Sequence, residues 1–237
     1  MINFNIQTLI NEVIEKESQY KTSKRDNQKF NVSDAGGCYR ARVYKRLGIE
    51  PTRDIDIASL RKMTAGTSGH NMLQSLLERG NKLFMSENEV GTEHLLGHPD
   101  GIIKHQDTKY LLEIKTIEKF QMGYIKKEGA KSPHLLQMFT YWTLLRKDIT
   151  DLNRAILSYV KREDFEAHDF YFNWSDNIQT QIDEEWNPLI KHWIDKTLPD
   201  CTCHLMYNGS GPKYCRYGID ETKCCDEKLF KKEKNGV

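Results

Sequence analysis

A short alternating segment, residues 109–116, constrains the fold of this 237-residue chain more than any other feature. Side chains along a β-strand point alternately to opposite faces, so a period of two separates this segment into two sets of residues. One face carries Tyr110, Leu112 and Ile114, and the other carries Leu111, Glu113 and Lys115. The pattern therefore predicts a β-strand that presents an acid and a base on the same face.

An aspartate precedes this strand at a distance typical of a β-hairpin. Asp100 lies in the segment 97–101, and Glu113 follows it by 13 residues. A turn at residues 106–108 would bring two strands together and place the two carboxylates side by side. Neighbouring carboxylates repel each other unless a divalent cation lies between them. The spacing therefore predicts a Mg²⁺ or Mn²⁺ site at Asp100 and Glu113.

Lys115 would complete a set of groups suited to phosphodiester hydrolysis. This reaction needs a nucleophilic water, neutralised charge on the phosphoryl oxygens and an aligned leaving group. A cation held by carboxylates beside an ammonium group can supply all three, and Lys115 would then orient the water or stabilise charge. The alternative is a merely solvated strand face, because an ExK tripeptide alone is a weak signal.

The sequences PD at 99–100 and EIK at 113–115 resemble the motif of PD-(D/E)xK nucleases, specifically of their RecB-like branch. That branch has an upstream histidine on a helix that follows a glycine-containing segment, and His70 is similar in type and place. It also has a QxxxY motif on the helix after the catalytic strand. Gln137 and Tyr141 match that spacing.

The resemblance implies a role for each matching residue. His70, Asp100 and Glu113 would bind the metal ion, Lys115 would be the catalytic lysine, and Gln137 and Tyr141 would position DNA or the lysine. An acidic residue often precedes the aspartate in this family; Glu89 matches that position, and Glu87 competes with it. The implied activity is that of a Mg²⁺- or Mn²⁺-dependent deoxyribonuclease. The family favours an exonuclease on single-stranded DNA ends, working in DNA replication, recombination, repair or CRISPR adaptation.

The cysteines indicate a second metal centre. The amino-terminal segment lacks the pattern of a signal peptide, and no apolar run approaches the roughly 20 residues of a membrane span. We therefore expect a cytoplasmic protein without a membrane partner. In that reducing compartment, cysteines are metal-bound, catalytic or reduced more often than disulfide-paired. The chain has six: Cys38, Cys201, Cys203, Cys215, Cys224 and Cys225.

The order of these cysteines resembles that of RecB-like nucleases with an iron–sulfur cluster, a subset that includes CRISPR-associated nucleases. In that subset one cysteine precedes the nuclease core and three follow it. The resemblance favours a 4Fe-4S cluster on Cys38, Cys203, Cys215 and Cys224, although Pro212 interrupts the family's usual CxxC pair. Cys201 and Cys225 stay open as alternative ligands, and Zn²⁺ stays open as the alternative metal, because four thiolates satisfy either. The centre would join the two chain ends as a structural staple.

The charge balance requires any nucleic-acid surface to be local. Lys and Arg number 35 against 34 Asp and Glu, for a net charge of +1. Phosphate binding needs several basic residues on one face. We expect them beside the active site: Arg40, Arg42, Lys45 and Arg46 on a helix after Cys38, and Lys126, Lys127 and Lys131 in a loop before the QxxxY helix, with Tyr39, Tyr124 and Tyr141 able to stack bases.

The periodicities and the resemblance together predict an α/β, restriction-endonuclease-like fold, with a mixed central sheet flanked by helices. We expect one nuclease domain over 1–237: a core at about 55–198, a cysteine lobe built from about 31–48 plus 199–225, and a loose tail at 226–237. Helices are predicted at about 6–20, docked on the core, in two pieces over 57–80, after Pro133, and at about 182–193. Two other functions remain open: a non-catalytic DNA-binding or docking module for a DNA-processing partner, and a zinc-stapled RNA nuclease.

Overall fold

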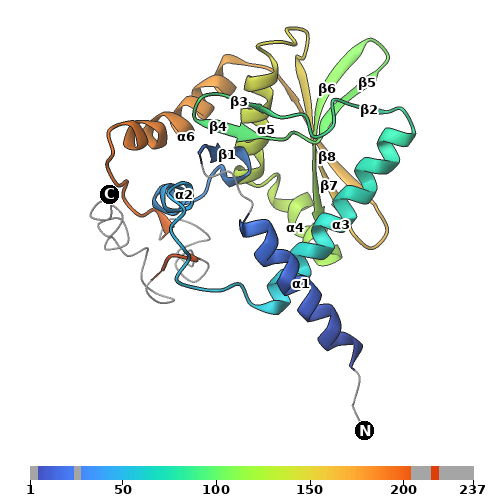
Figure 1. Cartoon of the computed structure of the whole chain (residues 1–237). Coiled ribbons are helices and arrows are strands. Elements are labelled where there is room, and N and C mark those ends of the chain that lie inside the picture. Colours follow the sequence, from blue (N-terminus) through green and yellow to red (C-terminus); the bar gives the residue numbers. More distant parts are fainter. Residues whose placement is uncertain (1–4, 24–27, 204–214, 219–237) are drawn as a thin grey trace.

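The computed structural model of the protein describes residues 5–23, 28–203 and 215–218. Its centre is a five-stranded mixed sheet in the order β2-β5-β6-β7-β8 (Figure 1). These strands span Leu83–Phe84 (β2), Gly101–His105 (β5), Thr108–Ile117 (β6), Arg154–Lys161 (β7) and Ala167–Asn173 (β8). β6 and β7 are parallel, and the other neighbouring pairs are antiparallel.

The predicted hairpin is present as β5 and β6. Its register pairs His105 with Thr108 at the turn and Gly101 with Leu112 at the far end. Two residues, Gln106 and Asp107, therefore form the turn. Asp100 directly precedes β5, which brings it level with Glu113 on the neighbouring strand.

Helices cover both faces of this sheet, so β6 and β7 are buried on both sides. On one face, α5 (Ser132–Leu145) packs with α6 (Asp176–Ile194) into the main apolar core, which includes Trp142, Trp186 and Leu157. On the other face, Leu73 and Leu77 of α3 (Ile57–Arg79) pack on a second cluster. Pro133 lies in the first turn of α5, where its missing N–H costs no helical hydrogen bond. The predicted mixed sheet flanked by helices is confirmed.

A second, smaller sheet lies beside the main core. It has the order β1-β4-β3, formed by Phe30–Asn31 (β1), Leu95–Gly97 (β4) and Val90–Gly91 (β3). β1 and β4 are parallel, and β3 and β4 are antiparallel. A 3-10 turn, Val32–Asp34, follows β1 and packs against α5. This small sheet holds β4 against the helix that carries Gln137 and Tyr141.

The two ends of the chain meet beside α2 (Tyr39–Arg46). The Arg40 guanidinium donates to the Pro199 carbonyl over 2.9 Å. The Arg53 amide donates to the Arg216 carbonyl over 3.0 Å. Figure 1 shows the segment after α6 returning to the side of α2. The two parts of the predicted lobe therefore contact each other within the described residues 31–48, 199–203 and 215–218.

Three helical predictions need correction. The segment 57–80 is one continuous helix, α3, capped at its start by the Asp56 side chain. The predicted loop that carries Lys126 and Lys127 is a helix, α4 (Lys119–Glu128), which begins with a capping box between Glu118 and Gln121. The first helix, α1 (Ile6–Ser23), contacts α3 but does not dock its apolar residues on the core: Ile6 is 59 % exposed and Val13 is 55 % exposed. Figure 1 shows α1 extending away from the sheet.

Candidate active site and cysteine centre

The β5–β6 hairpin places the Asp100 carboxylate against β6. The amide of Ile114 donates to its Oδ2 over 2.5 Å. This bond fixes the orientation of Asp100, whose side chain is 9 % exposed. The neighbouring Glu113 carboxylate is buried, and this burial, followed by repulsion from Asp100, raises the pKa of Glu113. The two acids thus share one buried space, as the hairpin spacing predicts.

Lys115 lies next to Glu113 on the same face of β6. Its ammonium group is 2.7 Å from Oε1 of Glu113 and donates to Oε1 of Gln137 over 2.7 Å. The Gln137 amide in turn donates to the hydroxyl of Tyr141 over 3.5 Å, one turn along α5. The alternation along β6 and the four-residue spacing on α5 bring these four side chains together. The structure therefore joins the EIK and QxxxY elements into one chain of polar contacts.

His70 reaches the aspartate from α3. Its Nε2 lies 3.2 Å from Oδ1 of Asp100, and this hydrogen bond raises the pKa of His70. One donor atom each from His70, Glu87 and Asp100 lies within 4.8 Å of the others. These are nitrogen and oxygen donors of the kinds that Mg²⁺ and Mn²⁺ accept. Of the two acidic candidates upstream, Glu87 belongs to this group.

Burial leaves Glu113 short of one partner. Its side chain is 1 % exposed, and its Oε2 has no hydrogen-bond partner within the part of the chain that the structure describes. Loss of hydration is the largest cause of the raised pKa of this carboxyl, followed by the charge of Asp100. An unpaired buried carboxylate oxygen beside a second carboxylate is an environment that a divalent cation would stabilise. The residues present therefore fit such an ion.

Gln74 organises the same site and was not among the residues predicted from the sequence. Its side chain is buried, and its Nε2 lies within hydrogen-bond distance of Ser86 Oγ, Glu87 Oε1 and the Asp100 carbonyl, at 2.9, 3.2 and 3.1 Å. The signal was available, because Gln74 follows His70 by four residues on a helix and therefore shares its face. Gln74 holds the Glu87 loop against the Asp100 loop.

Gly97 allows Tyr141 to approach the site closely. A Cβ at position 97 would lie 2.5 Å from Cε1 of Tyr141 and 2.9 Å from Cβ of Val32. Tyr141 and Val32 are both buried, so neither side chain can shift to make space for a Cβ. Burial raises the pKa of the Tyr141 hydroxyl far above its ordinary value, which keeps the phenol neutral. The missing side chain of Gly97 thus leaves the space that the Tyr141 ring occupies beside Gln137.

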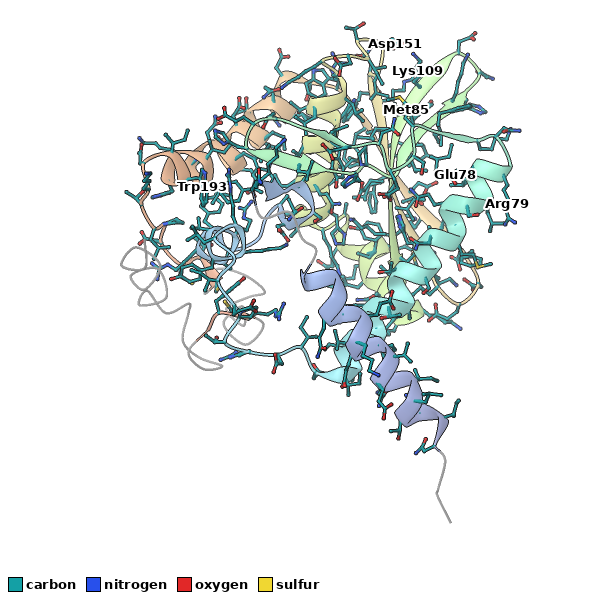
Figure 2. All side chains as sticks on the ribbon, in the orientation of Figure 1. Glu78, Arg79, Met85, Lys109, Asp151 and Trp193 are labelled. Carbon is teal, nitrogen blue, oxygen red and sulfur yellow. The ribbon has the colours of Figure 1, made fainter. Side chains whose placement is uncertain are left out.

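The basic residues of α2 have a different position from the one expected. Arg40 is 7 % exposed and Arg42 is 4 % exposed, so these guanidinium groups do not form a surface for phosphates. Arg42 forms a buried ion pair with Glu185 over 2.8 Å and lies over the Trp186 ring. These contacts join α2 to α6. Arg46 similarly lies over Trp193, which Figure 2 labels on α6.

The two lysines in the last turn of α4 are exposed, as expected for a charged surface. Lys127 is 82 % exposed and pairs with Glu128, whereas Lys126 is 47 % exposed and pairs with Glu166. Exposed pairs of this kind contribute little free energy. The lysines therefore remain accessible to another anion.

Cysteines from both ends of the chain meet in a small buried cluster. It contains Cys38, Cys201, Cys203 and Cys215, packed with Tyr44 and Tyr217. One sulfur each from Cys38, Cys201 and Cys203 lies within 4.8 Å of the others. Cys201 thus belongs to the group, which changes the expected set. Cys224 and Cys225 lie outside the described residues.

The spacing of two of these sulfurs bears on the metal. Cys38 Sγ and Cys201 Sγ are 3.7 Å apart. Two thiolates on one tetrahedral zinc ion, with Zn–S bonds of about 2.3 Å, stand about 3.8 Å apart. In a cubane cluster each thiolate binds its own iron, which sets the sulfurs farther apart. The donor set suits either centre, and the spacing matches a single ion.

Solved structures share the fold. The protein is similar to the alkaline exonuclease LHK-Exo of Laribacter hongkongensis, with a TM-score of 0.53 and 16 % identity over 72 % of this chain and 90 % of that chain. It is also similar to the protein SSO0001, with a TM-score of 0.53 and 19 % identity over 88 % and 94 % of the two chains. No family model matches the sequence, and a search among curated proteins gives no match. At these identities the likeness establishes the fold, and the restriction-endonuclease-like prediction is confirmed.

Proposed function

We propose that this protein is a metal-dependent nuclease that hydrolyses phosphodiester bonds in DNA. One observation carries the proposal: Asp100, Glu113 and Lys115 converge on one face of the β5–β6 hairpin, with the Lys115 ammonium 2.7 Å from the Glu113 carboxylate. The sequence predicts this convergence from a nuclease motif. A protein with the same fold, LHK-Exo, is described as an alkaline exonuclease.

Each group has a task that its position supports. His70, Glu87 and Asp100, whose donor atoms lie within 4.8 Å of one another, would hold a divalent cation together with the neighbouring Glu113. A bound Mg²⁺ or Mn²⁺ would lower the pKa of a water molecule and offset charge on the phosphoryl oxygens. The Lys115 ammonium, fixed by Gln137, would orient that water or stabilise the developing charge. Tyr141 acts through Gln137, so we assign it a positioning role.

We propose single-stranded DNA ends as the substrate. The family resemblance favours such ends. The described helices lack the length and apolar character needed to cross a lipid bilayer. A cytoplasmic location and a role in DNA processing with protein partners remain predictions.

The decisive experiment measures cleavage of end-labelled single-stranded DNA with Mn²⁺ or Mg²⁺. We expect the wild type to shorten the DNA from an end and Lys115→Ala to be slower by about 10²-fold or more. Lys109→Ala is the matched control, because Lys109 lies on the same face of the same strand. Figure 2 shows Lys109 beside Asp151, with which it forms an exposed ion pair over 2.9 Å.

The outcomes separate three functions. Cleavage lost in Lys115→Ala and kept in Lys109→Ala supports the nuclease. Binding of DNA without cleavage by the wild type would instead identify a non-catalytic docking module. Faster cleavage of RNA than of DNA of the same sequence would identify an RNA nuclease.

We further propose that the buried cysteines hold a metal centre that staples the chain ends together. Cys38, Cys201, Cys203 and Cys215 are the candidate ligands within the described residues. The family resemblance favours a 4Fe-4S cluster, whereas the sulfur spacing supports zinc. The visible spectrum of anaerobically purified protein, with an iron and zinc count, separates the two. Iron with absorbance near about 400 nm supports the cluster, and about one zinc per chain without colour supports the single ion.

A further inference from the structure

A groove opens between α3 and α4, beside the candidate active site. It has a volume of about 870 Å³ and is lined by Ala65 of α3, by Lys119, Phe120 and Gly123 of α4, and by Arg162 after β7. We call it the α3–α4 groove. Its size is in the range of ligand-binding clefts.

Two elements, α3 and the segment from β6 to α4, lead from the groove to the active site. The Thr116 hydroxyl at the end of β6 donates to the Gly66 carbonyl of α3 over 3.0 Å, which holds the two elements together at the groove. His70 follows Ala65 by five residues, or about 7.5 Å along a helix axis. Lys119 follows Lys115 by only four residues. A polymer bound at the active site would therefore extend into this groove.

Two aromatic side chains beside the groove are exposed to solvent. Phe120 is 75 % exposed and Tyr124 is 60 % exposed. They lie four residues apart on α4, so they share one face of the helix. Exposed aromatic rings of this kind are what single-strand-binding proteins use to stack nucleobases, since every base has a flat π-face. Base pairing in a duplex hides those faces.

The two acidic and two basic residues that line the groove balance in charge, and Lys119 is the cation available to an anion. The acidic side chains of the groove are engaged within the protein: Glu118 pairs with Arg162 over 3.2 Å, and Glu163 accepts from the Lys119 amide over 3.1 Å. The Lys119 ammonium, in contrast, forms no ion pair within the described ranges 5–23, 28–203 and 215–218. Lys127 adds an exposed positive charge on the same helix. A phosphate would therefore find a cation beside the exposed rings.

From these observations we infer that the α3–α4 groove binds the single-stranded DNA segment next to the bond that is cut. Bases of that segment stack on Phe120 and Tyr124, and its backbone lies near Lys119. The inference rests on the proposed function for its link to cleavage. The binding itself can be measured whether or not the protein cuts DNA.

The test is equilibrium binding of a fluorescein-labelled oligothymidylate, followed by anisotropy in EDTA so that no cleavage occurs. Phe120→Ala and Tyr124→Ala should each weaken binding by about 5- to 150-fold, the range for loss of one stacked base. Phe120→Trp should keep wild-type affinity or exceed it, because the ring is retained. Phe120→Leu should bind like Phe120→Ala, because an apolar side chain without a ring cannot stack.

Tyr171→Ala is the matched control. Tyr171 is 68 % exposed on β8, at the edge of the sheet, and it should bind DNA like the wild type. Wild-type affinity in Phe120→Ala and Tyr124→Ala, with their folding verified by thermal unfolding, would overturn the inference. If these variants lost the same affinity for a blunt-ended duplex, the preference of the groove for single-stranded DNA would be overturned. Lys115→Ala distinguishes the proposed nuclease activity from the proposed binding in the groove. Loss of cleavage with unchanged affinity for DNA in this variant would concern the active site alone.

Discussion

The Lys115 ammonium group lies 2.7 Å from a Glu113 carboxylate whose side chain is 1 % exposed. Lys115 is thus the direct counter-ion of the most deeply buried charge in the candidate site. Removing one member of a buried ion pair leaves the other without compensation, and this costs several kcal/mol. The pair therefore links the stability of the protein to its proposed chemistry.

Lys115→Met should lower the free energy of unfolding by about 3 kcal/mol without metal ions at a pH above the raised pKa of Glu113. The physical cause is the Glu113 charge, which the methionine leaves buried and unpaired. The double variant Lys115→Met/Glu113→Gln should recover most of that loss, because the charge is then absent. Urea unfolding in EDTA measures both. Equal destabilisation of the single and double variants would show that the packing of Lys115 matters and its charge does not.

Glu113→Gln alone should make the metal-free protein more stable by about 1 kcal/mol, because it removes a buried charge and, with it, the repulsion between Glu113 and Asp100. The variant should be inactive. Mn²⁺ should raise the unfolding temperature of the wild type, since a ligand at about 100 times its Kd stabilises by roughly 2.7 kcal/mol. Thermal unfolding with and without Mn²⁺ should show a much smaller rise for Glu113→Gln. A rise of the same size in both proteins would place the ion elsewhere.

Local patterns predict the centre of this site well. Strand alternation places Glu113 and Lys115 on one face, and the helical interval of four residues places Gln137 beside Tyr141. The hairpin spacing brings Asp100 level with Glu113. These relations depend on residues within one strand, one turn or one helix, so the sequence contains them directly.

Other features depend on distant contacts and were predicted wrongly or missed. Arg42 was expected on a phosphate-binding surface because it flanks the predicted active site, but it is buried against Glu185, which is 143 positions away. Glu87 rather than Glu89 joins the candidate metal site because of the conformation of its loop. There Glu87 has a φ of 53°, and its amide donates a hydrogen bond to the Pro99 carbonyl. In contrast, α4 was detectable, since Glu118 and Gln121 have the spacing of a capping box.

Gly97→Ala should destabilise the protein by about 1–3 kcal/mol and reduce its nuclease activity. The added methyl group would meet the Tyr141 ring at 2.5 Å, so Tyr141 must move away from Gln137. Gly123→Ala is the control for stability: its Cβ meets no atom within 4 Å, and alanine favours the helix by about 0.5–1 kcal/mol. Chemical denaturation of both variants should give changes of opposite sign. Unchanged stability in Gly97→Ala would contradict the close packing.

Cys38→Ser should release the metal and detach the carboxyl-terminal segment from α2. A centre that joins Cys38 to Cys201 closes a loop of 163 residues, and loss of such a cross-link costs about 3–5 kcal/mol. Hydrogen exchange should become faster in residues 39–49 and 199–203, whereas the β6 amides should change little. Thr202→Ala, between two cysteines, is the control and should keep the metal. Full metal content in Cys38→Ser would remove Cys38 from the ligand set.

His134 should make the protein less stable at acidic pH. Burial, followed by the charges of Lys115 and Lys131, lowers the pKa of His134 to about 3. Its Nδ1 lies 2.9 Å from the Tyr159 hydroxyl, which accepts from the Lys131 amide over 2.9 Å. The hydroxyl therefore donates to a neutral imidazole, and protonation of that nitrogen would remove the acceptor.

The sign follows from proton binding. In the unfolded chain His134 binds a proton below an ordinary histidine pKa of about 6.5, whereas in the folded protein it binds one only near pH 3. The free energy of unfolding therefore falls as the pH falls through this window, by up to about 1.4 kcal/mol per pH unit. Glu113 acts in the opposite direction between about pH 4.5 and 7, because its raised pKa makes the folded state bind the proton first. Urea unfolding from pH 7 to pH 4 should therefore be compared between the wild type and His134→Gln. The variant should lose less stability toward acid than the wild type, and parallel pH profiles would show that His134 is protonated as easily in the folded state as in the unfolded one.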